Sequence, residues 1–196
     1  LSGKDGAFAA IGQCLDREQF NTTCRILGFG QKLPLALQNK GSQFVLEKDM
    51  TAWAVAQTAI GQGRTGATPL YMAMLASAIA NDGMMMQPYI VDHVVYPNGN
   101  TGKNTVPKKL MEICSAEEAS LLKDMMTEVV TSGTGSAAAV SGITVAGKTG
   151  TSQVVYNKDI TTINQSYVMY APYDKPTYSI VVVSPNSSYN DGNIRE

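Results

Sequence analysis

The sequence has little charge of either sign. Lysine and arginine together number 15, and aspartate and glutamate number 16, among 196 residues, which leaves a formal net charge of −1. Without a basic excess, the composition gives no reason to expect binding to nucleic acid or to an anionic membrane surface. The hydrophobic share of 44% excludes a disordered chain, and the length allows one compact domain or a large part of a bigger one.

Residues that bind metals or form disulfides are scarce as well. The three cysteines, Cys14, Cys24 and Cys114, lack the spacing of a metal site and cannot all pair with one another. We interpret them as buried thiols, with a Cys14–Cys24 disulfide as the alternative. Neither a metal nor another cofactor is expected.

Long hydrophobic runs are also missing. No run could cross a bilayer, and no signal peptide is recognisable. Because the chain starts at Leu1 rather than at a methionine, we expect it to be part of a longer protein, with any membrane anchor outside these residues.

Helical patterns dominate up to about residue 140. Apolar residues recur at helical spacing after candidate N-cap residues, and the last long helix begins with a capping box of Ser115 and Glu118. Trp53 is expected to pack inward from the second helix. The predicted helices are 5–15, 51–60, 69–80, 116–131 and a short one at 136–140.

A β-hairpin interrupts this helical part. Residues 89–96 form one predicted strand, residues 97–100 the turn, and a short return strand extends to about Val106. The single histidine, His93, lies in the first strand, and we interpret it as an ordinary surface or partly buried residue.

Strand patterns gather at the C-terminal end. β-Branched and aromatic runs predict strands at 144–155, 166–171 and 178–183. The last run is almost continuously apolar and is therefore expected to be buried on both faces. A polar loop is predicted at 156–165, and the tail from Pro185 is expected to be loose.

Residues 145–155 contain the densest set of candidate binding groups. Apolar residues at both ends flank Lys148, Thr149, Gly150 and Thr151, a pattern typical of a strand whose middle stays accessible. Because side chains alternate along a strand, the hydroxyls of Thr149 and Thr151 lie on the same face. Two hydroxyls and one ammonium group suit a carboxylate, and Gly150 lets another backbone lie close.

Lys148-Thr149-Gly150 is also the third motif of penicillin-binding proteins and class A β-lactamases. Further motifs match in order and spacing through almost the whole chain. They are Gly-Gln-Gly at 61–63, Thr-Pro-Leu at 68–70, Ala-Asn-Asp-Gly at 80–83, Gly-Thr-Gly at 133–135 and Tyr-Ala-Pro at 170–172. In these motifs the sequence resembles the transpeptidase domain of high-molecular-weight, class B penicillin-binding proteins.

The resemblance implies an α+β fold of the β-lactamase/transpeptidase type, with residues 1–196 as one partial transpeptidase domain. A mainly helical part would span about 1–140, and the last three strands of an antiparallel sheet about 144–184. The intact protein would be a penicillin-binding D,D-transpeptidase that cross-links peptidoglycan at the extracytoplasmic face of the bacterial cell membrane. Its partners would be stem peptides ending in D-Ala-D-Ala and the β-lactams that mimic them.

The resemblance gives catalytic and binding roles to the third motif. Lys148 would supply positive potential to the substrate carboxylate and to proton transfer, and the hydroxyls of Thr149 and Thr151 would hold that carboxylate. The backbone N–H of Thr151 would be one of two oxyanion-hole donors, and Gly150 would keep the groove open for a substrate strand.

Two family motifs are absent or altered. The nucleophilic serine followed by a lysine three residues later is absent, since the literal match, Ser120 with Lys123, lies in a predicted helix and is interpreted as solvated helix surface. At the place of the second motif stand Gly3, Lys4 and Asp5, where Asp5 is a candidate substrate-binding residue. Either the second motif is degenerate in this protein, or the first few residues of the chain are an unrelated segment that stands in its place. The chain alone is therefore expected to be inactive.

Other functions fit parts of the sequence. A non-enzymatic module that binds or senses β-lactams or peptidoglycan would use the same scaffold, and a serine β-lactamase would need the same missing serine. Residues 61–66 match the dinucleotide fingerprint G-x-G-x-x-G, but a helix precedes them, so we interpret them as a glycine-rich turn.

A sheet with three of the family's five strands would leave one edge unpaired and one face partly uncovered. We expect the isolated chain to compensate by self-association, by binding a partner fragment or by repacking its own tail. The first of these would use the unpaired sheet edge.

Overall fold

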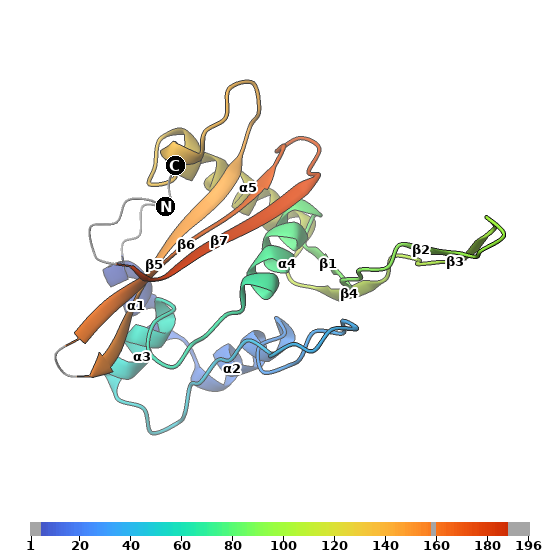
Figure 1. The fold of residues 1–196 in the computed structure, drawn as a ribbon. Coiled ribbons are helices and arrows are strands. Elements are labelled where there is room, and N and C mark those ends of the chain that lie inside the picture. The colour runs from blue at the N-terminus through green and yellow to red at the C-terminus, as the bar shows by residue number, and fades with distance from the viewer. Residues whose placement is uncertain (1–4, 158–159, 188–196) are drawn as a thin grey trace.

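The computed structural model describes residues 5–157 and 160–187, which fold as an α+β structure (Figure 1). Its helices are α1 (Asp5–Cys14), α2 (Arg17–Ile26), α3 (Ala52–Ala59), α4 (Pro69–Ala80), α5 (Ala116–Thr131) and the short η1 (Ser136–Ala138). Its strands are β1 (Met84–Met86), β2 (His93–Val95), β3 (Thr101–Asn104), β4 (Lys109–Glu112), β5 (Ala146–Asn157), β6 (Ile160–Ala171) and β7 (Tyr178–Ser187). None of the helices in the described ranges is both long and apolar enough to cross a membrane.

The C-terminal strands form an antiparallel sheet in the order β5-β6-β7, which confirms the predicted fold class. Helix α5 packs against β5, and helix α4 packs against β6 and β7 (Figure 1). The two helices meet the sheet in a core of Met126, Ala146 and Tyr170, in which Ala146 lies directly opposite Tyr170 across the ladder. Both helices therefore cover the same face of the sheet, and the outer edge of β5 has no strand partner in the described structure.

A second core joins α4 to the small ladder of β1 and β4. It contains Tyr71, Met74, Ala78 and Met85, which are all at most 7% exposed. Phe29, from the turn after α2, meets Tyr71 edge to face with ring centroids 5.1 Å apart. These contacts fix α4 between the small ladder and the main sheet, where it forms one wall of the candidate site.

The predicted helix starts are confirmed by their caps. Side-chain oxygens of Thr51, Thr68 and Ser115 accept hydrogen bonds from backbone N–H groups three residues later, and Ser115 with Glu118 completes the capping box. The sequence does not predict α2, although Asp16 caps it in the same way. Helix α2 is mostly polar, with Phe20, Cys24 and Ile26 as its apolar residues, so its low apolar content hid a helical period that is present.

The polar loop predicted at 156–165 is wrong. Strand β5 runs on to Asn157 and β6 begins at Ile160, so residues 156–157 and 160–165 belong to two paired strands. The ladder continues through pairs such as Gln153 opposite Ile163. Backbone pairing outweighs the polar side chains, which an antiparallel ribbon tolerates on its solvent side.

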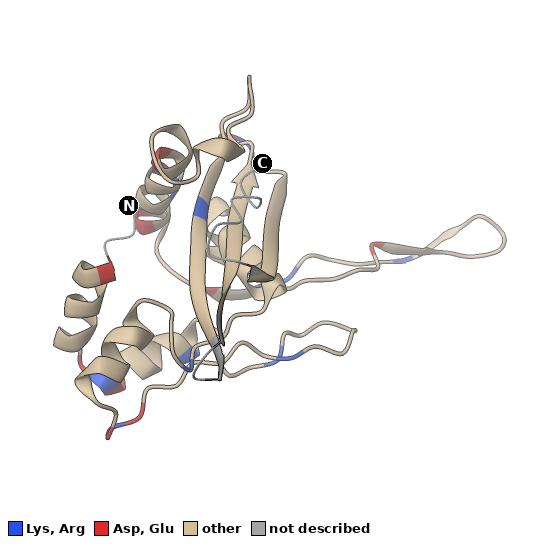
Figure 2. Cartoon of the chain, turned by 60° about the vertical axis from the view of Figure 1, so that its left-hand side comes forward, with Lys and Arg blue, Asp and Glu red and all other residues tan. Residues whose placement is uncertain are grey.

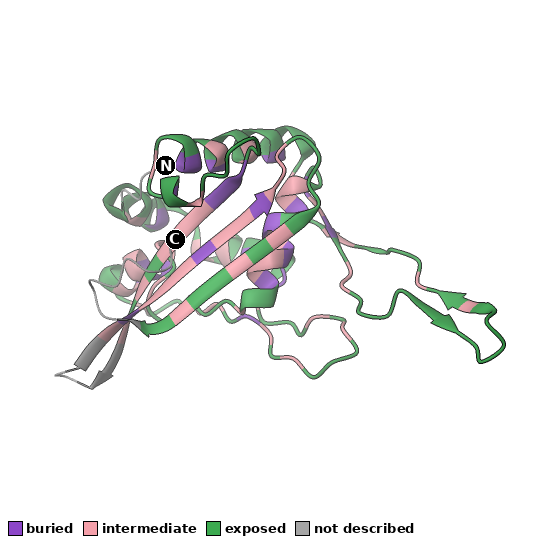
Figure 3. Cartoon of the chain, turned by 45° about the horizontal axis from the view of Figure 1, so that its top comes forward, coloured by how far each residue is buried: buried purple, intermediate pink, exposed green. Residues whose placement is uncertain are grey.

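The prediction that the last strand is buried on both faces is also wrong. Exposed residues run along β7, where Ile180 and Val182 are 42% and 46% exposed (Figure 3). Strand β7 is the other edge of the sheet, and α4 covers one of its faces, so the second face meets solvent. Of the predicted loose tail, residues 185–187 belong to β7, and residues 188–196 lie outside the described ranges.

The predicted hairpin at 89–106 is present with shorter strands. Strands β2 and β3 pair antiparallel and project from the rest of the molecule (Figure 1). Because no layer packs on this ribbon, Val94 and Val95 are 46% and 55% exposed. His93 is exposed beside Asp92, with Nδ1 3.0 Å from the carboxylate, which confirms its interpretation as a surface residue.

Trp53 does not pack inward, because it is 72% exposed. Helix α3 instead buries Val55 and Thr58, which lie on a different side of the helix from Trp53. Helix α1 meets α3 so closely that a Cβ on Gly12 would lie 2.2 Å from the Cβ of Ala59.

The three cysteines are free, which contradicts the alternative of a Cys14–Cys24 disulfide. Cys24 is buried as predicted, whereas Cys14 is exposed and Cys114 is intermediate. Cys14 is exposed because it ends α1, whose single buried residue is Gly12.

Gly83 lies three residues after α4 with φ of 85°, and a Cβ there would lie 2.0 Å from the carbonyl oxygen of Cys114. We predict that Gly83→Ala lowers the free energy of unfolding by about 2–4 kcal/mol, through both backbone strain and overlap. The matched control is Gly99→Ala, because Gly99 has φ of 81° but no atom within 4 Å of its Cβ position. It should cost about 1 kcal/mol. Equal losses for the two variants in chemical denaturation would contradict the role of the Cys114 contact.

Candidate functional site

Strand β5 lies at one edge of the sheet and has β6 as its single strand neighbour. The predicted site residues, 148–151, lie in the first half of this strand. Lys148 is the only charged residue within β5, β6 and β7, and Figure 2 shows how few charged residues lie on the sheet. This single cation therefore governs the local potential at the open edge.

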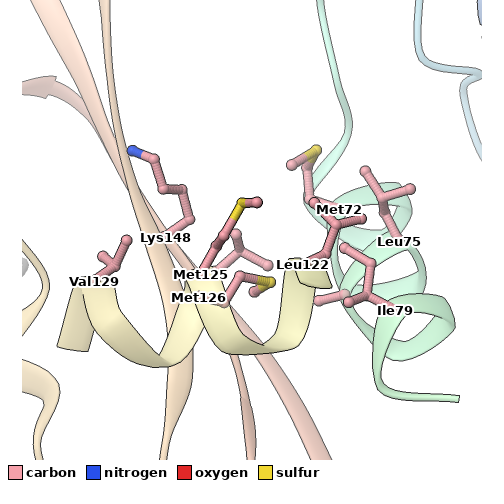
Figure 4. A pocket seen from close by; sticks show the side chains of 10 residues that line it. Met72, Leu75, Ile79, Leu122, Met125, Met126, Val129 and Lys148 are labelled. Atoms are coloured by element: carbon pink, nitrogen blue, oxygen red, sulfur yellow. The ribbon is translucent and has the colours of Figure 1, made fainter. Parts of the chain in front are cut away.

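The stem of Lys148 lies along the wall of an apolar cavity of about 270 Å³. Side chains of α4 and α5 form most of the lining, among them Leu75, Ile79 and Leu122. Figure 4 shows the amino group of Lys148 directed away from these side chains. Its Nζ donates a hydrogen bond to the backbone carbonyl of Thr149 at 2.8 Å.

Burial against this apolar wall lowers the pKa of Lys148 from its ordinary value of 10.5, because the wall disfavours the charged form. The charge of Asp5 acts in the opposite direction on the same pKa. Asp5 is exposed at the start of α1 and makes no ion pair with Lys148 in the described structure, so it acts through space. Gly3 and Lys4, the other residues of the altered motif, lie outside the described ranges.

The hydroxyl of Thr149 lies 2.8 Å from that of Thr134, in the Gly-Thr-Gly segment before η1. Tyr167 stands opposite Thr149 on β6, and its OH lies 2.4 Å from the Cβ position of Gly147 and 2.9 Å from that of Gly135. Glycine at positions 135 and 147 lets the segment before η1 and strand β5 pack directly on the ring of Tyr167. A side chain at either one would push Thr134 away from the site.

Gly150 makes room inside the sheet. A Cβ on Gly150 would lie 2.4 Å from the Oγ of Ser166, which donates a hydrogen bond to the Gly150 carbonyl at 3.3 Å. The free space is therefore filled by a side chain of β6 rather than by a second backbone. The next residue, Thr151, is exposed, so its hydroxyl is open to a ligand.

Backbone groups of alternate β5 residues point away from β6. The Thr149 carbonyl accepts from Lys148, the Thr151 carbonyl accepts from Nε2 of Gln62 at 3.4 Å, and the Gln153 N–H donates to Oε1 of Gln62 at 3.2 Å. In an antiparallel ladder, the N–H and C=O of one residue point to the same side of the strand. The N–H of Thr151 therefore also faces the open edge.

Ser120 and Lys123 do not form a nucleophile with its base. Ser120 is exposed on α5, as predicted for helix surface. Lys123 is not solvated, because its side chain is 15% exposed and its Nζ lies 2.6 Å from a carboxylate oxygen of Asp82. The amino group of Lys123 is therefore engaged by Asp82 and not by Ser120.

Residues 61–66 form a turn after α3, with Gly66 paired to Gln43 in an isolated bridge. A dinucleotide fingerprint must leave a strand and open a helix, and a helix precedes this turn. Within residues 5–157 and 160–187, no three His, Cys, Asp or Glu side chains gather as a metal site requires.

Sequence reasoning gives no role to Gln62 or Thr134, although both lie within motifs that it identifies. Their partners on β5, Thr151 and Thr149, are 89 and 15 positions away in the sequence. The available signal was a polar residue held between two glycines, at 61–63 and again at 133–135.

These groups together suit an extended ligand that ends in a carboxylate. Outward-facing backbone groups of Thr149 and Thr151 can pair with an extended chain, as in β-strand addition. The Lys148 ammonium and the threonine hydroxyls can bind the anion through charge-assisted hydrogen bonds.

The family model described as "Penicillin binding protein transpeptidase domain" matches residues 5–196. Stage V sporulation protein D of Bacillus subtilis is 33% identical over 184 residues, which are 91% of this chain and 28% of that protein. Peptidoglycan D,D-transpeptidase PbpA of Mycolicibacterium smegmatis is 28% identical over 179 residues, 90% of this chain and 36% of that protein. The chain thus spans 28% to 36% of the length of these curated relatives.

Solved structures show the same similarity. The D,D-transpeptidase domain of a peptidoglycan glycosyltransferase from Eggerthella lenta has a TM-score of 0.83 and 32% identity, over 94% of this chain and 46% of that one. The penicillin G acyl-enzyme complex of penicillin-binding protein A from M. tuberculosis has a TM-score of 0.81 and 27% identity, over 93% of this chain and 40% of that one. The fold type expected from the motifs is confirmed.

The lowered pKa of Lys148 has a consequence for stability. The unfolded chain binds this proton more strongly than the folded chain, so charged Lys148 destabilises the fold below its folded pKa, and the effect fades as the pH approaches 10.5. We predict that Lys148→Met raises Tm at pH 7 and that the gain shrinks as the pH rises from the folded pKa toward 10.5. Lys123→Met is the control and should show no gain, because it removes the ion pair with Asp82. A constant gain, or a lower Tm, for Lys148→Met would refute the desolvation argument.

Proposed function

Because the chain belongs to the penicillin-binding protein transpeptidase domain family, we propose that the intact protein is a peptidoglycan D,D-transpeptidase. A serine expected outside these 196 residues would attack the carbonyl of the penultimate D-alanine of a stem peptide and release the terminal D-alanine. An amine from a second stem peptide would then resolve the acyl-enzyme. The observation that carries this proposal is the open β5 edge with its one cation and two threonine hydroxyls.

The site residues would divide the work by position. Lys148, with the hydroxyls of Thr149 and Thr151, would bind the terminal carboxylate, and the outward N–H of Thr151 would donate to the developing oxyanion. Gly150 would leave room between them for the side chain of Ser166, which donates to the Gly150 carbonyl. Asp5 would contribute weakly, since its charge favours the protonated form of Lys148.

β-Lactams would acylate the same serine, as the structure of penicillin-binding protein A from M. tuberculosis with penicillin G illustrates for that relative. Peptidoglycan lies outside the cytoplasmic membrane, so the site would work on the extracytoplasmic face. No feature of the described residues favours the alternative of a non-enzymatic sensing module.

Acylation of the full-length protein by fluorescent penicillin tests the proposal. Lys148→Ala should slow acylation by roughly two to three orders of magnitude, because it removes the one cation that the described part of β5 carries. Lys123→Ala is the matched control, since Asp82 holds this lysine, and its rate should stay within a few-fold of wild type. The 196-residue chain alone should show no covalent adduct by mass spectrometry. An adduct on any of its serines, or equal effects of the two lysine variants, would refute the assignment.

We also propose that the isolated chain self-associates through the outer edge of β7. Tyr178, Ile180 and Val182 are 69%, 42% and 46% exposed there, and within the described structure β6 is the single strand that pairs with β7. Analytical ultracentrifugation at micromolar concentration should show dimers or larger species, and Val182→Lys should shift them toward monomer. A monomeric wild-type chain would contradict this proposal.

A further inference from the structure

The carboxamide of Gln62 occupies the outer edge of β5 where a ligand backbone would lie. Its Nε2 donates to the Thr151 carbonyl at 3.4 Å, and its Oε1 accepts from the Gln153 N–H at 3.2 Å. If the amide were flipped, its oxygen would face the Thr151 carbonyl and its NH₂ group would face the Gln153 N–H. Both contacts would be unfavourable, so they fix which atom is nitrogen. One side chain therefore offers the edge the donor and acceptor that an added strand would offer.

The Gly-Gln-Gly turn holds this side chain in place. Gly61 and Gly63 have φ of 80° and 71°, a region that favours glycine, while their Cβ positions have no atom nearer than 3.8 Å. Glycine is therefore required at these two positions by the backbone conformation and not by a lack of room for a side chain. The N–H of Gln62 also donates to the carbonyl of Gln57 at 2.8 Å, which ties the turn to α3.

Antiparallel pairing makes Gln62 a competitor of the substrate. Two residues that face each other in a hydrogen-bonded pair exchange both backbone hydrogen bonds. An acyl donor whose reacting carbonyl accepts from the Thr151 N–H therefore donates its own amide N–H to the Thr151 carbonyl. Nε2 of Gln62 already holds that carbonyl.

We infer that Gln62 is a specificity-determining residue that must release the Thr151 carbonyl before the amide N–H of an acyl donor can bind that carbonyl. The inference rests on the proposed function, because it takes the Thr151 N–H as an oxyanion donor. The contact to be broken is the longer of the two, at 3.4 Å, so the bond to Gln153 at 3.2 Å can persist while the donor enters. A donor with an amide N–H must break the Gln62 bond and replace it with its own, whereas a donor without one reacts with that bond in place. Gln62 therefore slows only donors of the first kind.

Two β-lactams separate these cases in the full-length protein. Penicillin G carries a 6-acylamino group with an amide N–H, and penicillanic acid has the same ring and carboxylate without that group. The ratio of their second-order acylation rate constants measures the competition, and it does not depend on the fraction of protein that is folded. Gln62→Ala and Gln62→Met remove the competing donor, so each should raise the ratio of penicillin G to penicillanic acid about three- to tenfold.

Gln43→Ala is the matched control. The Gln43 side chain donates to the Arg64 carbonyl in the same turn at 3.1 Å, so this variant loosens the turn while Gln62 keeps its amide. Its ratio should equal that of wild type. An unchanged or lower ratio in both Gln62 variants, or an equal rise in Gln43→Ala, would overturn the inference. A wild-type protein that penicillin G does not acylate would instead refute the proposed function and the inference with it.

Discussion

The one-sided pairing of β5 is the constraint on which the candidate site depends. A strand at a sheet edge leaves half of its backbone groups without a strand partner, and here these groups include those of Thr149, Thr151 and Gln153. Helices α4 and α5 cover one face behind this edge with apolar side chains. The stem of Lys148 is buried against that wall, so its charged end reaches only the edge, where it bonds to the Thr149 carbonyl.

Close packing on the other face of the strand sets the second half of the site. Tyr167 is 6% exposed and fills the space that glycines leave at 135 and 147. Because the loop closes over this ring, Thr134 reaches Thr149 and orients its hydroxyl. The two glycine-flanked motifs, at 61–63 and 133–135, thus do the same physical work: each lets a polar side chain from outside the sheet reach β5.

Local signals were enough for much of the fold and for the core of the site. N-caps such as Thr68 and Ser115, and the Lys-Thr-Gly strand, depend on residues a few positions apart, and the structure has them where the sequence predicts. Trp53 and the exposed face of β7 could not be predicted, because exposure depends on which elements cover a surface. The contact of Gln62 with Thr151 spans 89 positions and has no periodic signature.

The two edges of the sheet show why such contacts matter. An open strand edge invites pairing with any extended chain, so folded proteins must guard it. At β5, Lys148 and Gln62 bond to successive outward-facing groups and keep the edge occupied by the protein's own side chains. The two Gln62 bonds are exposed and measure 3.4 and 3.2 Å, so a ligand that makes better hydrogen bonds to β5 can replace them. The same side chains thus protect the edge and decide which ligands can pair with it. A ligand's amide has to replace the bond from Gln62, and its carboxylate has to bind Lys148.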